Sequence, residues 1–480
     1  MNRASSKRLS YDRRFALHLI TDQAFSRATG AYLMPGNTIR LLKNAAENYP
    51  AWLAAIRSAE RLIHFESYTI HEDGVGRQFA EALKAKAHEG IRVRLIYDWM
   101  GGLGKTSNHF WRSLTEAGVE VRCFNPPRLS DPLSWLRRDH RKSIIVDDRV
   151  AFVTGLCVGK MWVGNAQLGI DPWRDTGVEI RGPSVSDVAY AFAEVWAETG
   201  SPIPVDELPN PESIPEVGSV ALRILADAAF STSAYRLDTL VAALAKERLW
   251  LTDAYFAGIP TYVQALRAAA LDGVDIRLLV PGKGSDIGIM QTISRAGYRP
   301  LLEAGIRVFE WNGSMIHAKT AVADGRWARV GSTNLNPVSW MGNWELDVIV
   351  ENEGFGQAME EMYLEDLQNT TEIVLTGKRK IVSVGRSKSS RTRGAGGSGG
   401  RAVSGAVRIG NVIGAVITAK REHGPAETSL LIWLSIILTA LALVALIWPR
   451  LLAYPIAAIM LLIAFALWAT ANRLKNHRRE

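Results

Sequence analysis

The chain has 480 residues, 48% of them hydrophobic and 22% charged, which is typical of a folded protein with more than one domain. Only Cys123 and Cys157 are present, which excludes a disulfide framework and favours a reducing compartment. The net charge of +8 is unevenly placed: residues 1–377 carry 40 basic and 45 acidic side chains, whereas residues 378–421 carry 11 basic and no acidic ones. A mildly acidic body argues against a nucleic-acid-binding protein, which needs a basic surface.

The chain opens with a basic segment, residues 1–36, which lacks the apolar core of a secretory signal. Two similar units are expected to follow, at residues 37–200 and 219–375, joined by a Pro-rich connector at 201–218. In each unit, short β-branched runs alternate with helical patterns: strands near 90–97 and 273–280 follow helices near 78–88 and 261–271. This alternation predicts an α/β fold, with a largely parallel or mixed sheet in each of two similar units.

Each unit contains the same octet, His-x-Lys-x4-Asp, after these strands and helices, and the candidate catalytic residues come from the two octets. The sets are His140, Lys142 and Asp147 in the first unit, and His317, Lys319 and Asp324 in the second. Each octet enters a β-like run, where residues two apart project to the same face, so each His and Lys should lie together. A nucleophilic imidazole beside an ammonium suits attack on a phosphodiester. We expect Asp147 and Asp324 to hold the loop rather than to perform chemistry.

Polar residues downstream of each octet predict support for the same site. The turn that carries Ser332 and Asn334 could offer backbone N–H groups and a side-chain amide to a phosphate. Glu345 is the expected carboxylate partner of His317, and Asp175 is the expected partner of His140. Two such half-sites should face one another across one active site.

The character of the chain changes after residue 375. A basic Gly/Ser-rich linker is expected at 376–428, two transmembrane helices at 429–471, and a basic tail at 472–480. The uncharged runs 430–448 and 451–471 are each long enough to cross a bilayer, and Pro449-Arg450 allows only a tight turn between them. Because basic residues flank both ends of this hairpin, the catalytic body is expected on the cytoplasmic side.

The paired octets strongly resemble those of the phospholipase D superfamily, and the flanking segments resemble bacterial cardiolipin synthases. The segments that carry this similarity are Phe65–Tyr68, Trp173–Pro183, Asp253–Phe256 and Arg295–Leu302. The resemblance implies two pseudo-symmetric α/β/α sandwich repeats with one central active site shared between them. The same resemblance implies a phosphohistidine intermediate and no metal or other cofactor. It also implies a phospholipid substrate, with phosphatidylglycerol expected, and a location at the bacterial inner membrane.

This resemblance implies a phosphatidyltransferase that moves a phosphatidyl group to an alcohol such as phosphatidylglycerol. The alternatives are a phospholipase D-type hydrolase, a nuclease or phosphodiesterase of the same superfamily, and an inactive membrane scaffold. His140 is the expected nucleophile and His317 the expected acid and base, although the near symmetry of the halves leaves the reverse assignment open.

The chain departs from the family pattern in two places. The first half has Thr154-Gly-Leu-Cys157 where the family usually has Gly-Gly-x-Asn, so one amide donor is missing. The apolar hairpin is C-terminal, whereas the family's membrane helices are commonly N-terminal. Cys157 allows a redox or nucleophilic interpretation, but a small packed thiol is the expected role.

Overall fold

The computed structural model describes residues 21–127, 137–286, 291, 294–375, 381–384 and 461. The linker, the two apolar runs and the tail predicted after residue 375 lie almost wholly outside these ranges. Within them, no helix is both long enough and apolar enough to span a bilayer.

The two halves of the chain repeat one strand order. The first sheet runs, from edge to edge, β1 (Met34–Lys43), β8 (Thr176–Arg181), β7 (Val150–Thr154), β6 (Lys142–Val146), β2 (Leu62–Ser67), β3 (Arg92–Asp98) and β4 (Glu120–Phe124). The second runs β9 (Val220–Asp227), β15 (Asn343–Glu351), β14 (Trp327–Gly331), β13 (Thr320–Ala323), β10 (Arg248–Thr252), β11 (Asp275–Pro281) and β12 (Arg307–Trp311). The second sheet then adds β16 (Thr370–Leu375) and β17 (Ile381–Val384). In each sheet three strands are parallel and the octet strand runs antiparallel to them.

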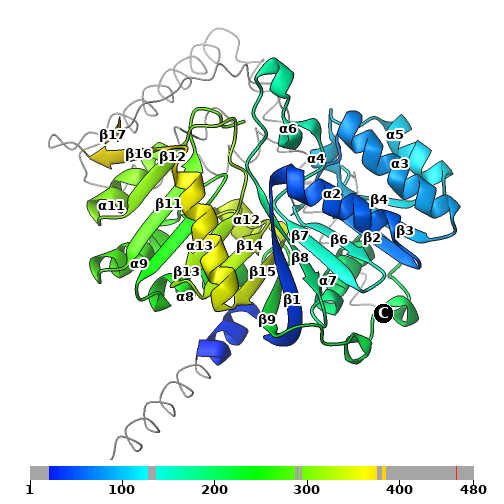
Figure 1. The fold of residues 1–480 in the computed structure, drawn as a ribbon, viewed down its shortest axis with the longest axis horizontal. Coiled ribbons are helices and arrows are strands. Elements are labelled where there is room, and N and C mark those ends of the chain that lie inside the picture. The colour runs from blue at the N-terminus through cyan, green and yellow to red at the C-terminus, as the bar shows by residue number, and fades with distance from the viewer. Residues whose placement is uncertain are drawn as a thin grey trace, which may run out of the picture.

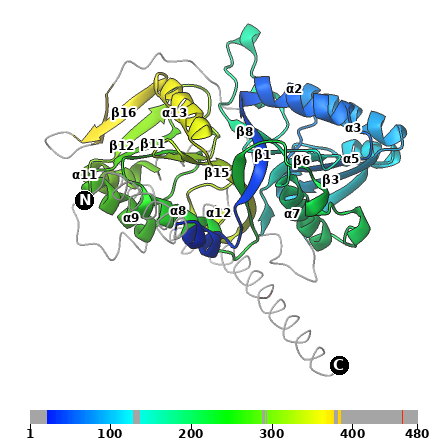
Figure 2. The same cartoon turned by 60° about the horizontal axis from the view of Figure 1, so that its bottom comes forward.

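Helices cover both faces of each sheet (Figure 2). In the first half, α2 (Asn44–Arg57), α3 (Gly74–His88) and α5 (Asn108–Glu116) lie on one face and α7 (Val185–Glu198) on the other. In the second half, α8 (Ser233–Leu244), α9 (Pro260–Leu271) and α11 (Tyr298–Glu303) lie on one face and α13 (Glu353–Leu367) on the other. The shorter α4 (Trp99–Gly102), α6 (Lys160–Val163) and α12 (Pro337–Met341) follow strand ends.

The alternation of side chains along the octet strand β6 explains this layering. Ile144 packs with Trp52 and Phe79 on the side of α2 and α3, whereas Ile145 packs with Phe192 of α7 on the other side. Because both faces are covered, successive residues Ile144, Ile145 and Val146 are all apolar, and only Lys142 and Ser143 at the start of the strand are polar. Local signals agree with this arrangement: the Asp73 side chain accepts from the N–H groups of Val75 and Gly76 and so caps α3.

A single hydrophobic cluster joins the halves. It contains Phe192 of α7 in the first half together with Leu346 and Val348 of β15 and Met359 of α13 in the second. The sheets lie next to one another along β1, β8, β14 and β15 (Figure 1), and β1 pairs with β9 through Met34 and Asn37. Such a shared core fixes the two halves relative to one another, so groups at their junction can form one site.

Candidate active site

The His and Lys of each octet lie at the start of the octet strand. Lys142 is the first residue of β6 and pairs across the sheet with Ser67, while Lys319 directly precedes β13. Each lysine Nζ donates to the carbonyl oxygen of its own histidine, in His140 and in His317. Both lysines are almost fully buried. The side chains predicted to share a face are therefore brought together in each half.

Each histidine is paired with a carboxylate from the other half of the chain. Nδ1 of His140 lies 2.9 Å from Oε2 of Glu345, and Nδ1 of His317 lies 2.7 Å from Oδ2 of Asp175. The sequence-based pairing, Asp175 with His140 and Glu345 with His317, was therefore wrong. The four residues are the expected ones, but their partners are exchanged between the halves.

The backbone explains this exchange. The short strand β5 (Arg138–Asp139) pairs in parallel with the start of β15, and the N–H of His140 donates to the carbonyl of Trp344 at 2.9 Å. In the other half-site, the N–H of His317 donates to the carbonyl of Arg174 at 2.7 Å. In each half-site, the backbone N–H of the histidine thus donates to the carbonyl of the residue that directly precedes the carboxylate from the other half. The sequence gives no sign of these short bridges between halves.

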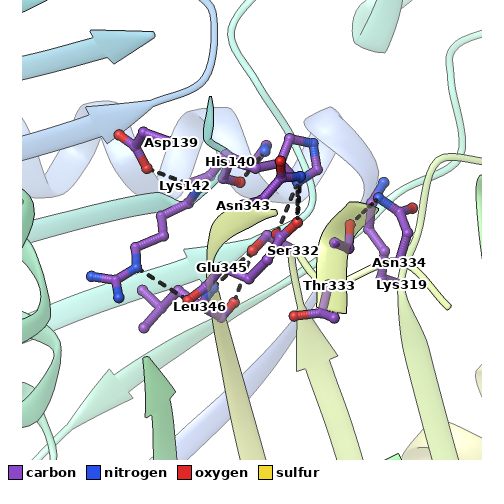
Figure 3. A network of polar contacts seen from close by, with 12 residues as sticks. Asp139, His140, Lys142, Lys319, Ser332, Thr333, Asn334, Asn343, Glu345 and Leu346 are labelled. Carbon is purple, nitrogen blue, oxygen red and sulfur yellow. Dashed lines mark hydrogen bonds and ion pairs between the residues drawn. The ribbon is translucent and has the colours of Figure 1, made fainter. Parts of the chain in front are cut away.

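Further bonds hold the two carboxylates in place. The indole Nε1 of Trp162 donates to Asp175 at 3.0 Å. Figure 3 shows the second carboxylate, Glu345, to which the amide of Asn343 donates at 3.0 Å. Both carboxyl groups are buried, which by itself raises their pKa. The adjoining histidine and lysine more than offset this, so that the pKa of Asp175 and that of Glu345 lie below their ordinary values. Both groups are therefore ionised near neutral pH.

The lysines of both halves act on both histidines. Burial lowers the pKa of His317 to about 4, with Lys319 and Lys142 adding to the effect and Asp175 opposing it. Burial also lowers the pKa of His140, with Glu345 opposing it and Lys142 and Lys319 adding to the lowering. Both imidazoles are consequently neutral at rest. Since Nδ1 of each ring faces a carboxylate, Nε2 is the atom available for nucleophilic attack or proton transfer.

Two tyrosines complete the half-sites and were not identified as site residues from the sequence. The Tyr68 ring lies 5.3 Å from the His140 ring and 5.3 Å from Nζ of Lys142. The Tyr255 ring lies 5.8 Å from the His317 ring and 5.7 Å from Nζ of Lys319. The signal was present, because Glu66-Ser-Tyr68 and Asp253-Ala-Tyr255 occupy equivalent places in the two repeats.

The aspartates of the octets lie at the far ends of their strands. The Asp147 carboxylate accepts from the backbone N–H groups of Glu60, Arg61 and Leu62 at 2.8–2.9 Å. Asp324 accepts from three successive N–H groups, those of residues 246–248, at 2.8–3.0 Å. Both residues have positive φ, at 53° and 51°. They anchor a turn to the start of a neighbouring strand, as expected, and do not belong with the catalytic side chains.

The turn after β14 lies beside Lys319, because the N–H of Gly331 donates to the Lys319 carbonyl. Two of its backbone donors are engaged: the N–H of Ser332 donates to the Leu346 carbonyl and that of Thr333 to Asp347. These two N–H groups are therefore occupied within the protein, and anion binding by the turn stays a prediction. The Ser332 hydroxyl contacts Leu346, and the Asn334 amide donates to Ser339 at 3.3 Å.

Cys157 occupies the position that Asn334 has in the other half, 17 residues after the octet histidine in each case. Its side chain is buried, and burial raises the pKa of its thiol, with Lys142 and Lys319 opposing the shift. Its carbonyl accepts from the Tyr49 hydroxyl at 2.7 Å. A buried, protonated thiol among packed side chains favours the packing role over a nucleophilic one.

Comparison with known proteins gives the class of protein that the two octets predict. A family model described as the cardiolipin synthase, phospholipase D-like domain matches residues 52–160 and 241–367. The crystal structure of a phosphatidylserine synthase from Haemophilus influenzae resembles this fold with a TM-score of 0.58 and 14% identity, over 73% of this chain and 91% of that one. The fold is therefore that of the phospholipase D-like α/β proteins.

The relatives narrow this class further. A cardiolipin synthase A of Pseudomonas fluorescens is 32% identical over 71% of this chain and 70% of its own length. A cardiolipin synthase of Geobacillus kaustophilus is 33% identical over 69% of this chain and 66% of its own length. The chain belongs to the cardiolipin synthase family, and the predicted class of enzyme, a phospholipase D-like phosphatidyltransferase, is confirmed.

Proposed function

We propose that the protein transfers a phosphatidyl group to the headgroup hydroxyl of phosphatidylglycerol through a phosphohistidine, giving cardiolipin and glycerol. The observation that carries this proposal is the pair of crossed histidine–carboxylate contacts, 2.9 Å and 2.7 Å long, with a buried lysine beside each. Two neutral imidazoles on one phosphodiester suit a reaction in two displacements.

In the first displacement, Nε2 of His140 attacks phosphorus and the bond to the glycerol oxygen breaks. A protonated His317 gives its proton to that oxygen, and glycerol leaves. In the second, His317 takes the proton from the incoming hydroxyl, whose oxygen attacks phosphorus while the bond to His140 breaks. Lys142 and Lys319 balance the charge of the non-bridging oxygens, and Asn334 supplies an amide to the same group. No metal or other cofactor takes part in this scheme.

The two carboxylates, each paired with the histidine of the other half, suit both the nucleophile His140 and the acid and base His317. Glu345 and Asp175 accept the Nδ1 proton of the opposite ring, fix its tautomer and stabilise the positive charge that develops on it. The folded pKa of His317, about 4, describes the site without substrate. A bound anionic phosphate favours the charged imidazolium, so the protonated state that the leaving alcohol requires becomes accessible in the complex.

The lipid nature of the substrate is supported by the family and by the sequence after residue 375. The basic stretch 378–421 and the two apolar runs suit an anchor beside an anionic bacterial inner membrane, with the catalytic body on its cytoplasmic side. Deleting residues 422–480 should leave a protein that high salt or alkaline washing removes from membranes without detergent. A truncated protein that still needs detergent for its release would contradict this topology.

The function is tested by offering labelled phosphatidylglycerol to the purified full chain and separating the products. Labelled diphosphatidylglycerol with release of glycerol is the expected result. If phosphatidic acid is the only product, water is the acceptor, and the protein is a hydrolase rather than a transferase. No turnover of any phospholipid would overturn the proposal, and the His140→Ala variant controls for a contaminating enzyme.

A further inference from the structure

Residues 161–173 form a hydrogen-bonded hairpin that stands away from the body of the protein. The N–H of Trp173 donates to the Met161 carbonyl at 3.0 Å, and Asn165 and Ile170 exchange two backbone bonds of 2.7 and 2.9 Å. Gly164 and Gly169 take the positive φ values of 72° and 64° that the two bends require. Figures 1 and 2 both show this segment, beside α6, projecting beyond the sheets and helices. The hairpin is therefore a defined structure rather than a loose connection.

The tip of this hairpin presents aliphatic side chains to solvent. Val163, Leu168 and Ile170 are 50%, 72% and 44% exposed. Residues 161–170 contain no charged side chain, and Asp171 is the first one after them. Asn165 and Gln167, which lie between Val163 and Leu168, are exposed and polar but uncharged. A structured turn with three exposed aliphatic side chains and no charge indicates a surface that becomes buried against something apolar.

The base of the same hairpin belongs to the active site. The Trp162 ring lies 5.8 Å from the His317 ring, and the Trp173 ring lies 5.7 Å from it. Trp162 also donates to Asp175, the carboxylate that holds His317. The hairpin thus connects the catalytic imidazole directly to the exposed aliphatic tip. Whatever covers the tip therefore lies on the side of the protein from which the hairpin reaches the His317 half-site.

Basic side chains flank the hairpin near its base. Lys160 directly precedes it, and Lys160 and Lys105 both act on the nearby His71, whose ring lies 6.4 Å from that of Trp162. Asp73, whose carboxylate accepts from the Lys160 N–H at 2.8 Å, acts on His71 in the opposite sense, so this base carries two ammonium groups and one carboxylate. An aliphatic tip with ammonium groups behind it matches a bilayer interface, where acyl chains lie beneath anionic headgroups. The tip is too small for a stable protein interface, which buries about 1,000 Å² or more.

We infer that the 161–173 hairpin inserts its tip into the surface of an anionic phospholipid bilayer and holds the His317 half-site against it. This inference rests on the proposed function for the identity of the lipid, but it concerns a contact separate from the C-terminal apolar runs. Its role is to let a phospholipid headgroup reach the two histidines while the acyl chains remain in the bilayer.

The first test compares two ways of presenting the same phosphatidylglycerol to the full chain, in vesicles and in detergent micelles. The triple variant Val163→Ser, Leu168→Ser, Ile170→Ser should lose about tenfold or more of the vesicle rate, because each aliphatic side chain contributes to insertion. Its micelle rate should stay within about twofold of the unchanged protein, because detergent delivers lipid without insertion. Leu271→Ser is the matched control: Leu271 is also 72% exposed but ends α9 at the opposite edge of the sheet.

An unchanged vesicle rate in the triple variant would overturn the inference. Equal losses in vesicles and micelles would also overturn it, because they would indicate damage to the site rather than lost docking. Loss in vesicles alone, with an unchanged Leu271→Ser control, would support it.

A second measurement does not depend on turnover. An environment-sensitive fluorophore is attached at Leu168→Cys or at Leu271→Cys in a Cys123→Ser background, with Cys157 left buried. The emission of the label at 168 should shift to the blue on phosphatidylglycerol vesicles, and that of the label at 271 should not. No shift at 168 overturns the inference. A blue shift of the label at 168 in a protein that turns over no phospholipid would contradict the proposed function but would still support insertion of the hairpin tip.

Discussion

The imidazole of His140 contacts Glu345, a residue 205 positions further along the chain and in the other half of the fold. The same relationship, reversed, joins His317 to Asp175. Neither half therefore contains a complete histidine–carboxylate pair, and neither repeat can perform the chemistry by itself. This is a physical reason for keeping both repeats in one chain with one shared hydrophobic core.

The crossing predicts which carboxylate supports which histidine. In a His317→Ala background, a phosphatidyl donor with a nitrophenol leaving group should still label His140, because that leaving group needs no proton. Adding Glu345→Gln should slow this labelling by about tenfold or more, since the ring loses the acceptor that orients it. Adding Asp175→Asn should leave it nearly unchanged, because its own partner is already absent. Rapid quenching and peptide mapping measure the labelled fraction.

The opposite pattern, with Asp175→Asn slowing the labelling and Glu345→Gln leaving it unchanged, would contradict the crossed arrangement. Labelling of His317 in the His140→Ala protein, with none on His140 in the reciprocal variant, would reverse the assignment of nucleophile and acid.

How far the sequence could predict this site depends on the range of the interactions. The octets fix which imidazoles and lysines are used, because residues two apart on a strand share a face. The partners Glu345 and Asp175 were found by residue type but assigned to the wrong histidines. Their assignment depends on β5 pairing with β15 and on Arg141, whose Nε donates to the Glu345 carbonyl at 3.1 Å. Contacts between segments about 200 residues apart leave no periodic signal in either segment.

Elements of the fold could be predicted from the sequence where their signals are local, and were missed where they are not. Alternating strand and helix patterns predicted the layers, since period and apolarity are local properties. The 161–173 hairpin, whose first residues belong to the short helix α6, could not be predicted in that way, because its tip is uncharged and carries aliphatic side chains that are exposed. Periodic patterns report burial within one protein and do not report burial against a second surface.

Asp147 should matter for stability far more than for chemistry. Its carboxylate accepts from three backbone N–H groups, and leaving a buried donor without a partner costs about 1–3 kcal/mol. Asp147→Ala should therefore lower the free energy of unfolding by about 2–4 kcal/mol, and Asp147→Asn by less. Thermal and denaturant unfolding measure this, and the folded fraction should keep most of its specific activity.

Glu60→Ala provides the matched control. It keeps the backbone N–H that Asp147 accepts from and removes an exposed side-chain ion pair with Arg149, which contributes little to stability. A stable Asp147→Ala protein that has lost turnover would return Asp147 to the catalytic set.

Cys157 should be dispensable. Its thiol is buried and held protonated by its surroundings, so Cys157→Ala should keep turnover within about fivefold, the loss arising from a small cavity. Alkylating reagents should inactivate the folded protein slowly, and mass spectrometry of the Cys157 peptide measures that rate.

Cys157→Asn restores the amide found at the equivalent Asn334, and its activity relative to Cys157→Ala reports whether this half-site uses such a donor. Loss of all turnover in Cys157→Ala would favour a chemical role for the thiol.

Lys319 should set the alkaline limit of the reaction. Burial lowers the pKa of this ammonium to about 8, with Asp175 opposing the shift. The lysine is charged below that pKa and neutral above it, so kcat/KM should fall as the pH rises through about 8. The limit for kcat should lie higher, because bound phosphate favours the ammonium.

Lys319→Arg should remove the alkaline limit of kcat/KM at a lower maximal rate, since a guanidinium stays charged to beyond pH 12 but is shaped differently. Asp175→Asn should move the limit of kcat/KM to lower pH. Rates are measured from chromatographically separated products between about pH 5 and 10, and an alkaline limit that is the same in Lys319→Arg would assign it to another group.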